Sequence, residues 1–381
     1  MDFIVSSGAL LKNLQLVGGI ISTNVVVPIL ENFLFELKGN TLTITGSDME
    51  TMIKASMEVQ SENPAEGGNQ IICVPSKIFM DYLKNLPEQP LHIKTHPEDF
   101  SIEISSNSGK YKIGGENGKE YPKEAEAEDL NSFSIPSNIL TEAISKTIFA
   151  TSTDNLRPAM TGVFFELNEE GITFVATDGH RLVKISRTDI DCPNEGGIIA
   201  PRKPLQHLKN ILPDDDSLLK LSYNKTHLFV ENQQIKLNCR LIDGKFPPYR
   251  AVIPAENPYV LLVNRPDLIS CLRRVSIFAS KSTQQIVFDI VGSTINISGQ
   301  DLDFSFEGKE TLTCQFNGPD MKIGFNGKLL IEMLNNISGD DVKIELSTPS
   351  RAGIYKPAEQ PENTDLLMLL MPLMVGLESN D

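Results

Sequence analysis

The sequence predicts an α+β protein made of three copies of one unit, each with two helices packed on antiparallel sheets. Two observations lead to this fold class. The first is a repeated strand pair in which an acidic residue precedes an aspartate by twelve positions, at Glu36 and Asp48, Glu166 and Asp178, and Asp289 and Asp301. The second is a helix-like segment before each strand pair and another after it.

The second helices give an independent measure of the repeat. Lys77, Lys203 and Lys328 hold matching places in them, 126 and 125 residues apart, and the three aspartates are 130 and 123 residues apart. Because two landmarks give nearly the same period, chance is a poor explanation. Repeated units more often build a scaffold, ring or array than a single catalytic cleft.

Six helices are expected, the first of each copy over residues 7–22, 136–152 and 265–280 and the second over residues 75–86, 201–212 and 326–337. In the first helix, Leu10, Leu14, Val17 and Ile21 recur at the spacing of one helix face. That face is predicted to be buried.

Within a copy, the expected order is a strand, a helix, three strands, a second helix, and further strands ending in a hairpin such as residues 218–242. The 381 residues then divide into domains 1–128, 129–255 and 256–381, each near the common domain size. Acidic or proline-rich joints are expected over residues 115–132 and 253–259, and a flexible loop over residues 356–365.

Several features predict a cytoplasmic protein without membrane contact. The N-terminus has no signal-peptide pattern, and the five cysteines form no C-x-x-C pair, as is typical of reduced, buried thiols. The apolar run 366–377 has only twelve residues and contains a proline, well short of the roughly 20 that span a bilayer. A closing strand is expected there.

Charge is unevenly distributed along the chain. The net charge of −16 by itself argues against nucleic acid. Yet the six helix windows carry eleven basic residues and only four acidic ones. If the helices share one surface, that surface is basic on an otherwise acidic body; the alternative is that lysines on helix surfaces serve solubility alone.

Patterns for catalysis are weak. The letters of an S-x-x-K motif at Ser217 to Lys220 precede a predicted strand and lack supporting motifs. The five histidines have no metal-ligand spacing, and no phosphate-binding glycine loop is present. We therefore expect no catalytic residue, no metal and no cofactor.

One segment of the second copy departs from its counterparts. It reads Asp178, Gly179, His180, Arg181, Leu182, where the first copy has DMET and the third has DLDF. A tight turn explains Gly179, since glycine accepts a positive φ without steric cost. The three residues that follow indicate a binding role special to this copy, although a His–Asp pair also admits acid–base chemistry.

With these residues, the chain resembles the bacterial DNA polymerase III beta subunits, the sliding clamps. The resemblance rests on VATDGHRLVKIS (175–186), VPILENFLFEL (27–37), LIDGKFPPYR (241–250) and LLMPL (369–373), in register over the whole chain. It implies a homodimer, paired head to tail, that forms a ring of six DNA-clamp domains with helices inward. Duplex DNA would pass through the hole independently of sequence, and the ring would act as a processivity factor for the replicative polymerase.

The resemblance also implies a pocket for partner peptides between the second and third domains. The implied partners are the replicative polymerase subunit, the clamp loader, repair polymerases and mismatch-repair proteins. A short peptide ending in Leu or Phe would fill an apolar groove, in which methionines repack around different sequences. Carried over by position, its walls are Arg157, Met160, Thr177, Gly179, His180, Arg181, Leu182, Pro247, Val252, Leu369, Leu370, Met371, Pro372 and Leu373.

Two further surfaces follow from the resemblance. DNA-facing side chains are expected at Lys12, Lys77, Lys84, Lys146, Arg202, Lys203, Lys209, Arg273 and Arg274. A dimer interface is expected at Lys110, Tyr111, Ile277 and Phe278, with Lys110 and Lys112 meeting Asp303 and Glu307.

The chain departs from the family pattern in two places. It continues past Leu373 to Asp381, so the tail either lies across the pocket or hangs free. Asn24 and Asp154 stand where DNA-contacting basic or amide residues are usual, so contacts there are not carried over. Two alternatives remain open: a nucleic-acid-processing enzyme with catalytic His180, and a repeat scaffold that binds only proteins.

Overall fold

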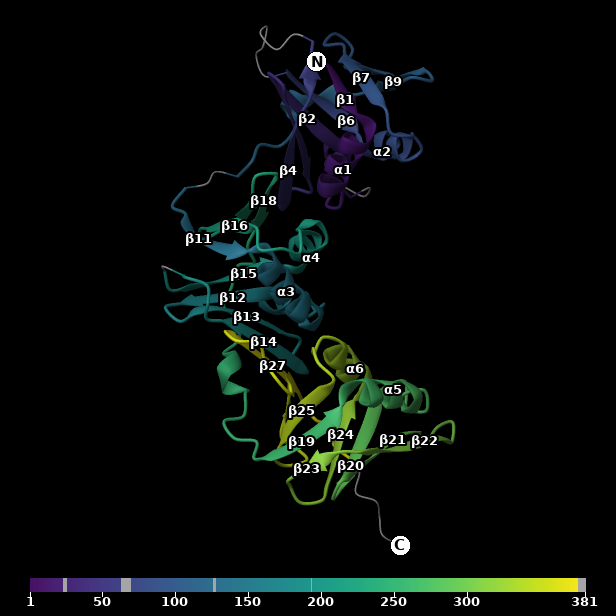
Figure 1. The fold of residues 1–381 in the computed structure, drawn as a ribbon, viewed down its shortest axis with the longest axis vertical. Coiled ribbons are helices and arrows are strands. Elements are labelled where there is room, and N and C mark those ends of the chain that lie inside the picture. The colour runs from purple at the N-terminus through teal and green to yellow at the C-terminus, as the bar shows by residue number, and fades with distance from the viewer. Residues whose placement is uncertain (23–25, 63–69, 126–127, 193, 376–381) are drawn as a thin grey trace. The chain divides into compact units, whose positions relative to one another are not determined.

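The computed structural model describes residues 1–22, 26–62, 70–125, 128–192 and 194–375 (Figure 1). The chain divides into two compact units. Unit 1 comprises Met1–Ile139 and Lys203–Leu241, and unit 2 comprises Leu140–Arg202 and Ile242–Asp381. The middle copy of the repeat therefore contributes to both units.

The described residues form six α-helices, two in each copy. They are α1 (Ser7–Gly18), α2 (Ser76–Lys84), α3 (Ser137–Thr147), α4 (Arg202–Ile211), α5 (Arg265–Val275) and α6 (Gly327–Asn335). Three begin at a side-chain cap, in which Ser6, Asn264 and Asn326 each accept a hydrogen bond from a backbone N–H three residues on. All six helices were predicted, and each is slightly shorter than its window.

The end of α1 changes one core assignment. Leu10, Leu14 and Val17 are fully buried, as predicted from their spacing. Beyond Gly18 the chain leaves the helix, so Ile20 is buried in place of Ile21. Helical spacing no longer applies past the last helical residue.

Unit 1 contains two antiparallel sheets. The five-stranded sheet has the order β5 (Gln60–Ser61), β1 (Asp2–Ser6), β7 (Pro90–Thr95), β8 (Ser101–Ser105), β9 (Lys110–Gly114). The nine-stranded sheet has the order β10 (Glu116–Asn117), β6 (Gln70–Pro75), β2 (Asn32–Lys38), β3 (Thr41–Ser47), β4 (Thr51–Glu58), β18 (Ile235–Arg240), β17 (His227–Glu231), β16 (Leu218–Tyr223), β11 (Asn131–Pro136). Its seam between the first two copies is the β4–β18 pair, with Met52 opposite Asn238.

Unit 2 repeats this arrangement. Its nine-stranded sheet has the order β15 (Gly196–Pro201), β12 (Gly162–Asn168), β13 (Gly171–Thr177), β14 (Arg181–Arg187), β27 (Thr364–Leu370), β26 (Gly353–Pro357), β25 (Asp341–Leu346), β19 (Tyr259–Asn264), β23 (Gln315–Phe316). The four-stranded sheet has the order β22 (Phe306–Thr313), β21 (Thr294–Asp301), β20 (Gln285–Val291), β24 (Met321–Asn326). The seam between the second and third copies is the β14–β27 pair, with Leu182 opposite Leu369.

The strand count within a copy corrects the sequence prediction. Four strands of six residues or more, not three, separate the two helices; the additional ones are β6, β15 and β24. Each is six residues long and runs directly into the second helix. The sequence prediction began the second helices at Pro75, Pro201 and Asn326, the last residues of these strands, and assigned no strand before them.

Helices lie against one another within each unit. In unit 1, α1 contacts α2, and the imidazole of His207 on α4 reaches the Leu16 carbonyl oxygen of α1 at 2.6 Å. In unit 2, α5 and α6 lie side by side (Figure 1), and Lys146 at the end of α3 donates to the Asn336 carbonyl oxygen just after α6, at 2.6 Å. Each unit thus groups helices from two copies.

Three predictions on the rest of the chain can be compared with the fold. All five cysteines are buried free thiols, as expected. Residues 366–370 of the apolar C-terminal run lie in β27, residues 371–375 follow the strand, and the end of the run lies outside the described residues. Residues 358–363 form the loop that precedes β27. In the described part of the chain, no helix combines the length and apolar character needed to traverse a bilayer.

A candidate peptide pocket and basic surfaces

A cavity of about 290 Å³ lies in unit 2. Ten of the predicted pocket residues line it: Met160, Thr177, Gly179, His180, Arg181, Leu182, Pro247, Val252, Leu369 and Met371. Pro248, Tyr249 and Ala251 also line it and were missed. Their only signal was position, between the two predicted residues Pro247 and Val252.

Four predicted residues do not line the cavity. Leu370 is buried on the other side of β27, because successive side chains of a strand alternate between faces and Leu369 and Met371 take the cavity side. Arg157 lies beside the turn, where its guanidinium would be 3.3 Å from a Cβ at Gly179. Pro372 and Leu373 lie beyond the rim, and Leu373 N donates to the Gly324 carbonyl oxygen at 2.8 Å.

The first wall is a tight turn between β13 and β14. Gly179 has φ +91°, the left-handed conformation expected of an Asp-Gly turn. One carboxylate oxygen of Asp178 accepts hydrogen bonds from the backbone N–H groups of His180 at 2.9 Å and Arg181 at 3.0 Å. The Thr177 hydroxyl donates to the Arg181 carbonyl oxygen at 2.7 Å. The turn is therefore closed by its own polar groups.

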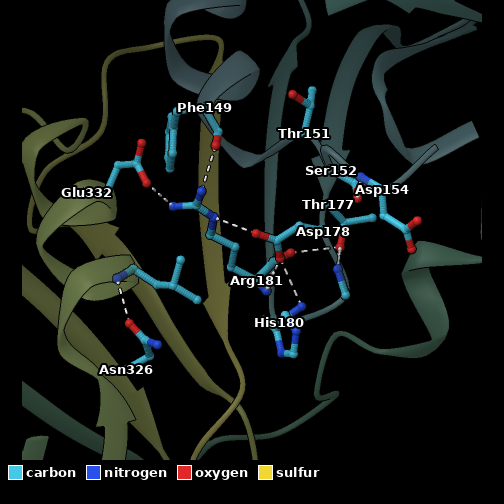
Figure 2. Close-up of polar contacts among 12 residues, drawn as sticks. Phe149, Thr151, Ser152, Asp154, Thr177, Asp178, His180, Arg181, Asn326 and Glu332 are labelled. Atoms are coloured by element: carbon cyan, nitrogen blue, oxygen red, sulfur yellow. Dashed lines mark hydrogen bonds and ion pairs between the residues drawn. The ribbon is translucent and has the colours of Figure 1, made fainter. Parts of the chain in front are cut away.

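Arg181 leaves this turn as a buried cation, with a side chain only 6% exposed. Figure 2 shows its guanidinium between Asp178, the Phe149 carbonyl and Glu332. It donates to Asp178 at 3.1 Å, to the Phe149 carbonyl oxygen at 2.7 Å and to Glu332 at 2.7 Å, and it lies over the Phe149 ring. These partners satisfy a charge that would otherwise be costly to bury.

Acid–base chemistry finds little support at this turn. The described residues give the His180 imidazole no hydrogen-bond partner, and the Asp178 carboxylate is occupied by the backbone and by Arg181. Among the described residues, no group of three His, Cys, Asp or Glu side chains is arranged to hold a metal ion.

The second wall is the segment Pro247–Val252, held by Glu166 of β12. The Tyr249 hydroxyl donates to this carboxylate, and Arg250 makes two hydrogen bonds to it, at 2.7 and 2.8 Å. Burial together with the Glu166 carboxylate raises the pKa of Tyr249, so its hydroxyl stays protonated and donating at neutral pH. At the mouth, Val252 and Met371 are 54% and 43% exposed, which leaves apolar surface facing solvent.

The predicted DNA-facing cations fall into two groups. Five have partners: Lys84 with Asp81, Lys146 with Asn336 and Ser338, Lys203 with Asp48, Arg273 with Asn335, and Arg274 with Glu310. Lys12, Lys77, Arg202 and Lys209 have no side-chain partner among the described residues. The second group is the better placed to meet an external anion.

The predicted interface residues lie on or near free sheet edges. Lys110 and Tyr111 belong to β9, the outer strand of its sheet, and the Tyr111 ring lies 4.6 Å from that of Tyr82. Ile277 and Phe278 follow α5 and are 74% and 39% exposed. Phe278 packs over Gly308 of β22, the outer strand of the four-stranded sheet. No described strand pairs with the outer edge of β9 or β22.

Comparison with known proteins identifies the family. Models of the N-terminal, central and C-terminal domains of the DNA polymerase III beta subunit match residues 1–125, 134–248 and 250–373. The chain belongs to the DNA polymerase III beta subunit family. The resemblance inferred from the sequence, and with it the α+β class and the three clamp domains, is confirmed.

Members of this family resemble the chain over its whole length. The beta sliding clamp of Pseudomonas aeruginosa is 28% identical over 375 residues, which cover 98% of this chain and 100% of the relative. A crystal structure of the Pseudomonas aeruginosa DNA polymerase III beta subunit has a TM-score of 0.90 at 25% identity and the same coverage. A second structure, of that organism's sliding clamp bound to griselimycin, has a TM-score of 0.92 at 25% identity and again the same coverage.

The described residues cover only part of the two segments that depart from the expected family pattern. After Leu373 the tail follows β24, and the Gln285 side chain donates to the Met374 carbonyl oxygen at 3.0 Å; residues 376–381 lie outside the described residues. Asn24 also lies outside them. The Asp154 carboxylate accepts from the Leu156 backbone N–H at 2.9 Å and from the Arg157 side chain at 3.2 Å, so it holds its own loop.

Proposed function

We propose that this chain is a non-catalytic processivity factor: two copies form a ring around duplex DNA, slide along it, and tether the replicative polymerase. The observation that carries the proposal is the whole-length match to beta sliding clamps, together with an apolar cavity at the segment that distinguishes the second copy. We assign domain boundaries near residues 128 and 255. The reduced cysteines support action in the cytoplasm.

The cavity is proposed to bind a short, extended peptide ending in Leu or Phe. Leu182, Leu369 and Met371 supply apolar surface for its side chains. The clamp loader, repair polymerases and mismatch-repair proteins would compete for the same cavity, because each needs only a short apolar anchor. Griselimycin, bound by the Pseudomonas aeruginosa clamp, is proposed to occupy this cavity too.

The basic side chains without partners are proposed to face DNA. A ring that slides needs attraction to phosphates without contacts to base edges that fix its position. Lys12, Lys77, Arg202 and Lys209 meet this need, whereas Lys146, Lys203 and Arg274 are engaged within the chain. The acidic remainder of the surface would discourage DNA from binding elsewhere.

We propose a dimer register that copies the two seams inside the chain. Each seam joins the strand after the repeated turn of one copy to the last strand of the next. Met52 and Leu182 hold equivalent places, opposite the residue before the repeated aspartate, and they face Asn238 and Leu369. Glu307 holds that place in β22, opposite Gln300.

The matching residue of the first copy is Lys112. In each copy, a row of paired residues crosses the sheet from the strand before the first helix to the last strand. Each row starts four positions before the residue that directly precedes that helix. The three equivalent rows are Asp2, Lys94, Glu103, Lys112; Ser132, Ser222, Phe229, Asn238; and Val260, Glu345, Ile354, Leu369. A third seam of the same kind places Lys112 opposite Glu307 of the partner subunit. Opposite charges facing each other across two strands are favourable.

The same register places Tyr111 opposite Gly308 of the partner subunit. Because Phe278 packs over Gly308 of its own chain, the Tyr111 ring would meet an aromatic surface there. In the proposed register Lys110 would lie opposite Lys309 of the partner subunit, which differs from the pairing of Lys110 with Asp303 expected from the sequence.

The decisive experiment for the ring is retention on DNA of different topology. The protein, loaded by its own clamp loader, should remain on closed circular DNA at high salt and be lost when that DNA is linearised. Only topological binding depends on free ends. Equal retention on both forms would oppose the ring, and DNA-processing activity that depends on His180 would favour the enzyme.

The pocket is tested separately by Leu182→Ala combined with Met371→Ala. Affinity for a labelled peptide from the polymerase C-terminus should fall by about tenfold or more, since two anchoring surfaces are truncated. Unchanged affinity would show that the peptide binds elsewhere.

A further inference from the structure

The first wall of the cavity belongs to the second copy but is hydrogen-bonded to a side chain of the third copy. Five turn residues line the cavity, namely Thr177, Gly179, His180, Arg181 and Leu182. Figure 2 shows that the Arg181 guanidinium points toward Glu332, which lies on α6 of the third copy. There it donates to a carboxylate oxygen of Glu332 at 2.7 Å. One side chain of α6 is thus bonded to the turn that forms the wall.

Glu332 stands on a rigid support. Its neighbours Leu330, Met333 and Leu334 on α6 are fully buried, and the helix begins at the Asn326 cap. A charged group on a packed helix keeps its position better than one on a loop. Its own side chain is 44% exposed, so it reaches Arg181 from the solvent side of the contact.

The equivalent ion pair at the turn of the first copy has its positive and negative charges exchanged between turn and helix. Thr51 stands where the second copy has Arg181, and the turn aspartate Asp48 binds Lys203 from α4. At that seam the helix supplies the cation and the turn the anion; at the seam beside the cavity the turn supplies the cation and the helix the anion. The reversal occurs in the copy that carries the cavity.

A second bond links the same turn to the opposite rim. The Met371 backbone N–H donates to the His180 carbonyl oxygen at 2.9 Å. Movement of the His180 backbone would therefore shift Met371 as well.

We propose that Glu332 is a positioning residue of the peptide cavity: it holds Arg181 extended toward α6 and so keeps the His180–Leu182 wall in the form that binds an extended apolar peptide. This inference rests on the proposed peptide-binding function. Without the carboxylate, Arg181 keeps Asp178, the Phe149 carbonyl and the strand pairing of its backbone with Leu370, but among the described residues its guanidinium loses its hydrogen bond to the third copy. A binding form that is only partly populated lowers the apparent affinity in proportion.

The test compares Glu332→Ala and Glu332→Gln with Asp365→Ala in the full-length protein. Asp365 is the matched control, because it pairs with Lys184 on the same seam at 2.8 Å but does not line the cavity. Griselimycin and a labelled peptide ending in Leu-Phe are the probes, with the dissociation constant and the rates of association and dissociation as readouts. Thermal unfolding is measured in parallel.

We expect Glu332→Ala to weaken binding of both probes by about tenfold, chiefly through slower association because fewer molecules are in the binding form, and Asp365→Ala to leave it within about twofold. Glu332→Gln, which keeps the volume and one acceptor oxygen, should lie between them and guards against a folding defect in the alanine variant. A lower melting temperature with unchanged affinity for both Glu332 variants would overturn the inference and leave the pocket intact. Failure of the wild-type protein to bind either probe would instead overturn the proposed function.

Discussion

Lys203 of α4 donates to the carboxylate of Asp48, the aspartate that ends the first repeated strand pair, and also to the Ile20 carbonyl oxygen at 3.3 Å. The lysine thereby joins the second copy to the first. Its neighbour Arg202 has no side-chain partner among the described residues. Two adjacent cations of one helix therefore differ, because Lys203 is paired within the chain and Arg202 has no side-chain partner among the described residues.

The first prediction tests whether Arg202 and Lys209 attract DNA while Lys203 stabilises the fold. Arg202→Glu with Lys209→Glu should slow loading onto primed circular DNA several-fold and reduce the salt dependence of loading, because phosphate attraction is lost. The melting temperature should stay the same. Lys203→Glu should in contrast lower the melting temperature, since it places two carboxylates together. If Arg202→Glu with Lys209→Glu loads as well as wild type, these side chains do not face DNA.

The second prediction concerns the turn at the cavity. Gly179→Ala should reduce the free energy of unfolding by about 1 kcal/mol, because alanine is strained at positive φ. It should also weaken peptide binding, since the added Cβ lies 3.3 Å from the Arg157 guanidinium and 3.7 Å from Met160. Gly39→Ala is the control: its φ is +59° and its surroundings are open, so only stability should fall. Equal peptide affinity in both variants would contradict this view.

The third prediction is a pH dependence of stability. Burial lowers the pKa of His207, whose imidazole packs over Gly19 and contacts the Leu16 carbonyl oxygen, with the Lys203 cation nearby. The unfolded state, with a pKa near 6.5, then binds a proton more readily than the folded state. The stability that the folded protein gains from a neutral, buried His207 is therefore fully present above about pH 6.5 and is lost as the pH falls below that value.

Chemical denaturation at several pH values checks this effect. His207→Gln should lose part of the decrease in unfolding free energy that wild type shows between about pH 7.5 and 5.5. The wild-type protein, measured in parallel, supplies the reference slope. A His207→Gln variant with that same slope would show that the ring is free to protonate in the folded state.

The fourth prediction tests the dimer register. Lys112→Cys combined with Glu307→Cys should form an intersubunit disulfide under mild oxidation, because directly opposed Cβ atoms approach within about 5.5 Å. Lys110→Cys with Glu307→Cys, displaced by two residues, should cross-link much more slowly. The native cysteines are buried, and burial raises the pKa of Cys73, Cys239 and Cys271 to about 12, so they should stay silent. Equal cross-linking of both pairs would rule out this register.

Much of the fold was readable from spacing alone. The acidic pair twelve residues apart marks a β-hairpin, and in the structure Glu36, Glu166 and Asp289 do lie on the first strand of such hairpins. Helices were found because their apolar positions recur. The strands before the second helices were missed because six residues running into a helix carry too little periodicity.

The candidate cavity was less accessible to sequence reasoning. The resemblance supplied ten residues that line the cavity. It also supplied Leu370, which does not line it, because position in the chain does not reveal which face of a strand points toward the cavity. The ion pair between Arg181 and Glu332 spans 151 residues, and no local pattern connects them. Likewise, the charge count treated Lys203 and Arg202 alike, since only the fold brings Asp48 to one of them.

The two nine-stranded sheets have a practical consequence for anyone who divides this chain. Each crosses a boundary between copies, so a cut between the second and third copies would separate β14 from β27 and bare one strand edge on each fragment. Exposed edges of this length invite pairing with other chains. Domain fragments made at the repeat boundaries should therefore aggregate, and the smallest portion of this protein worth expressing is the entire three-copy polypeptide.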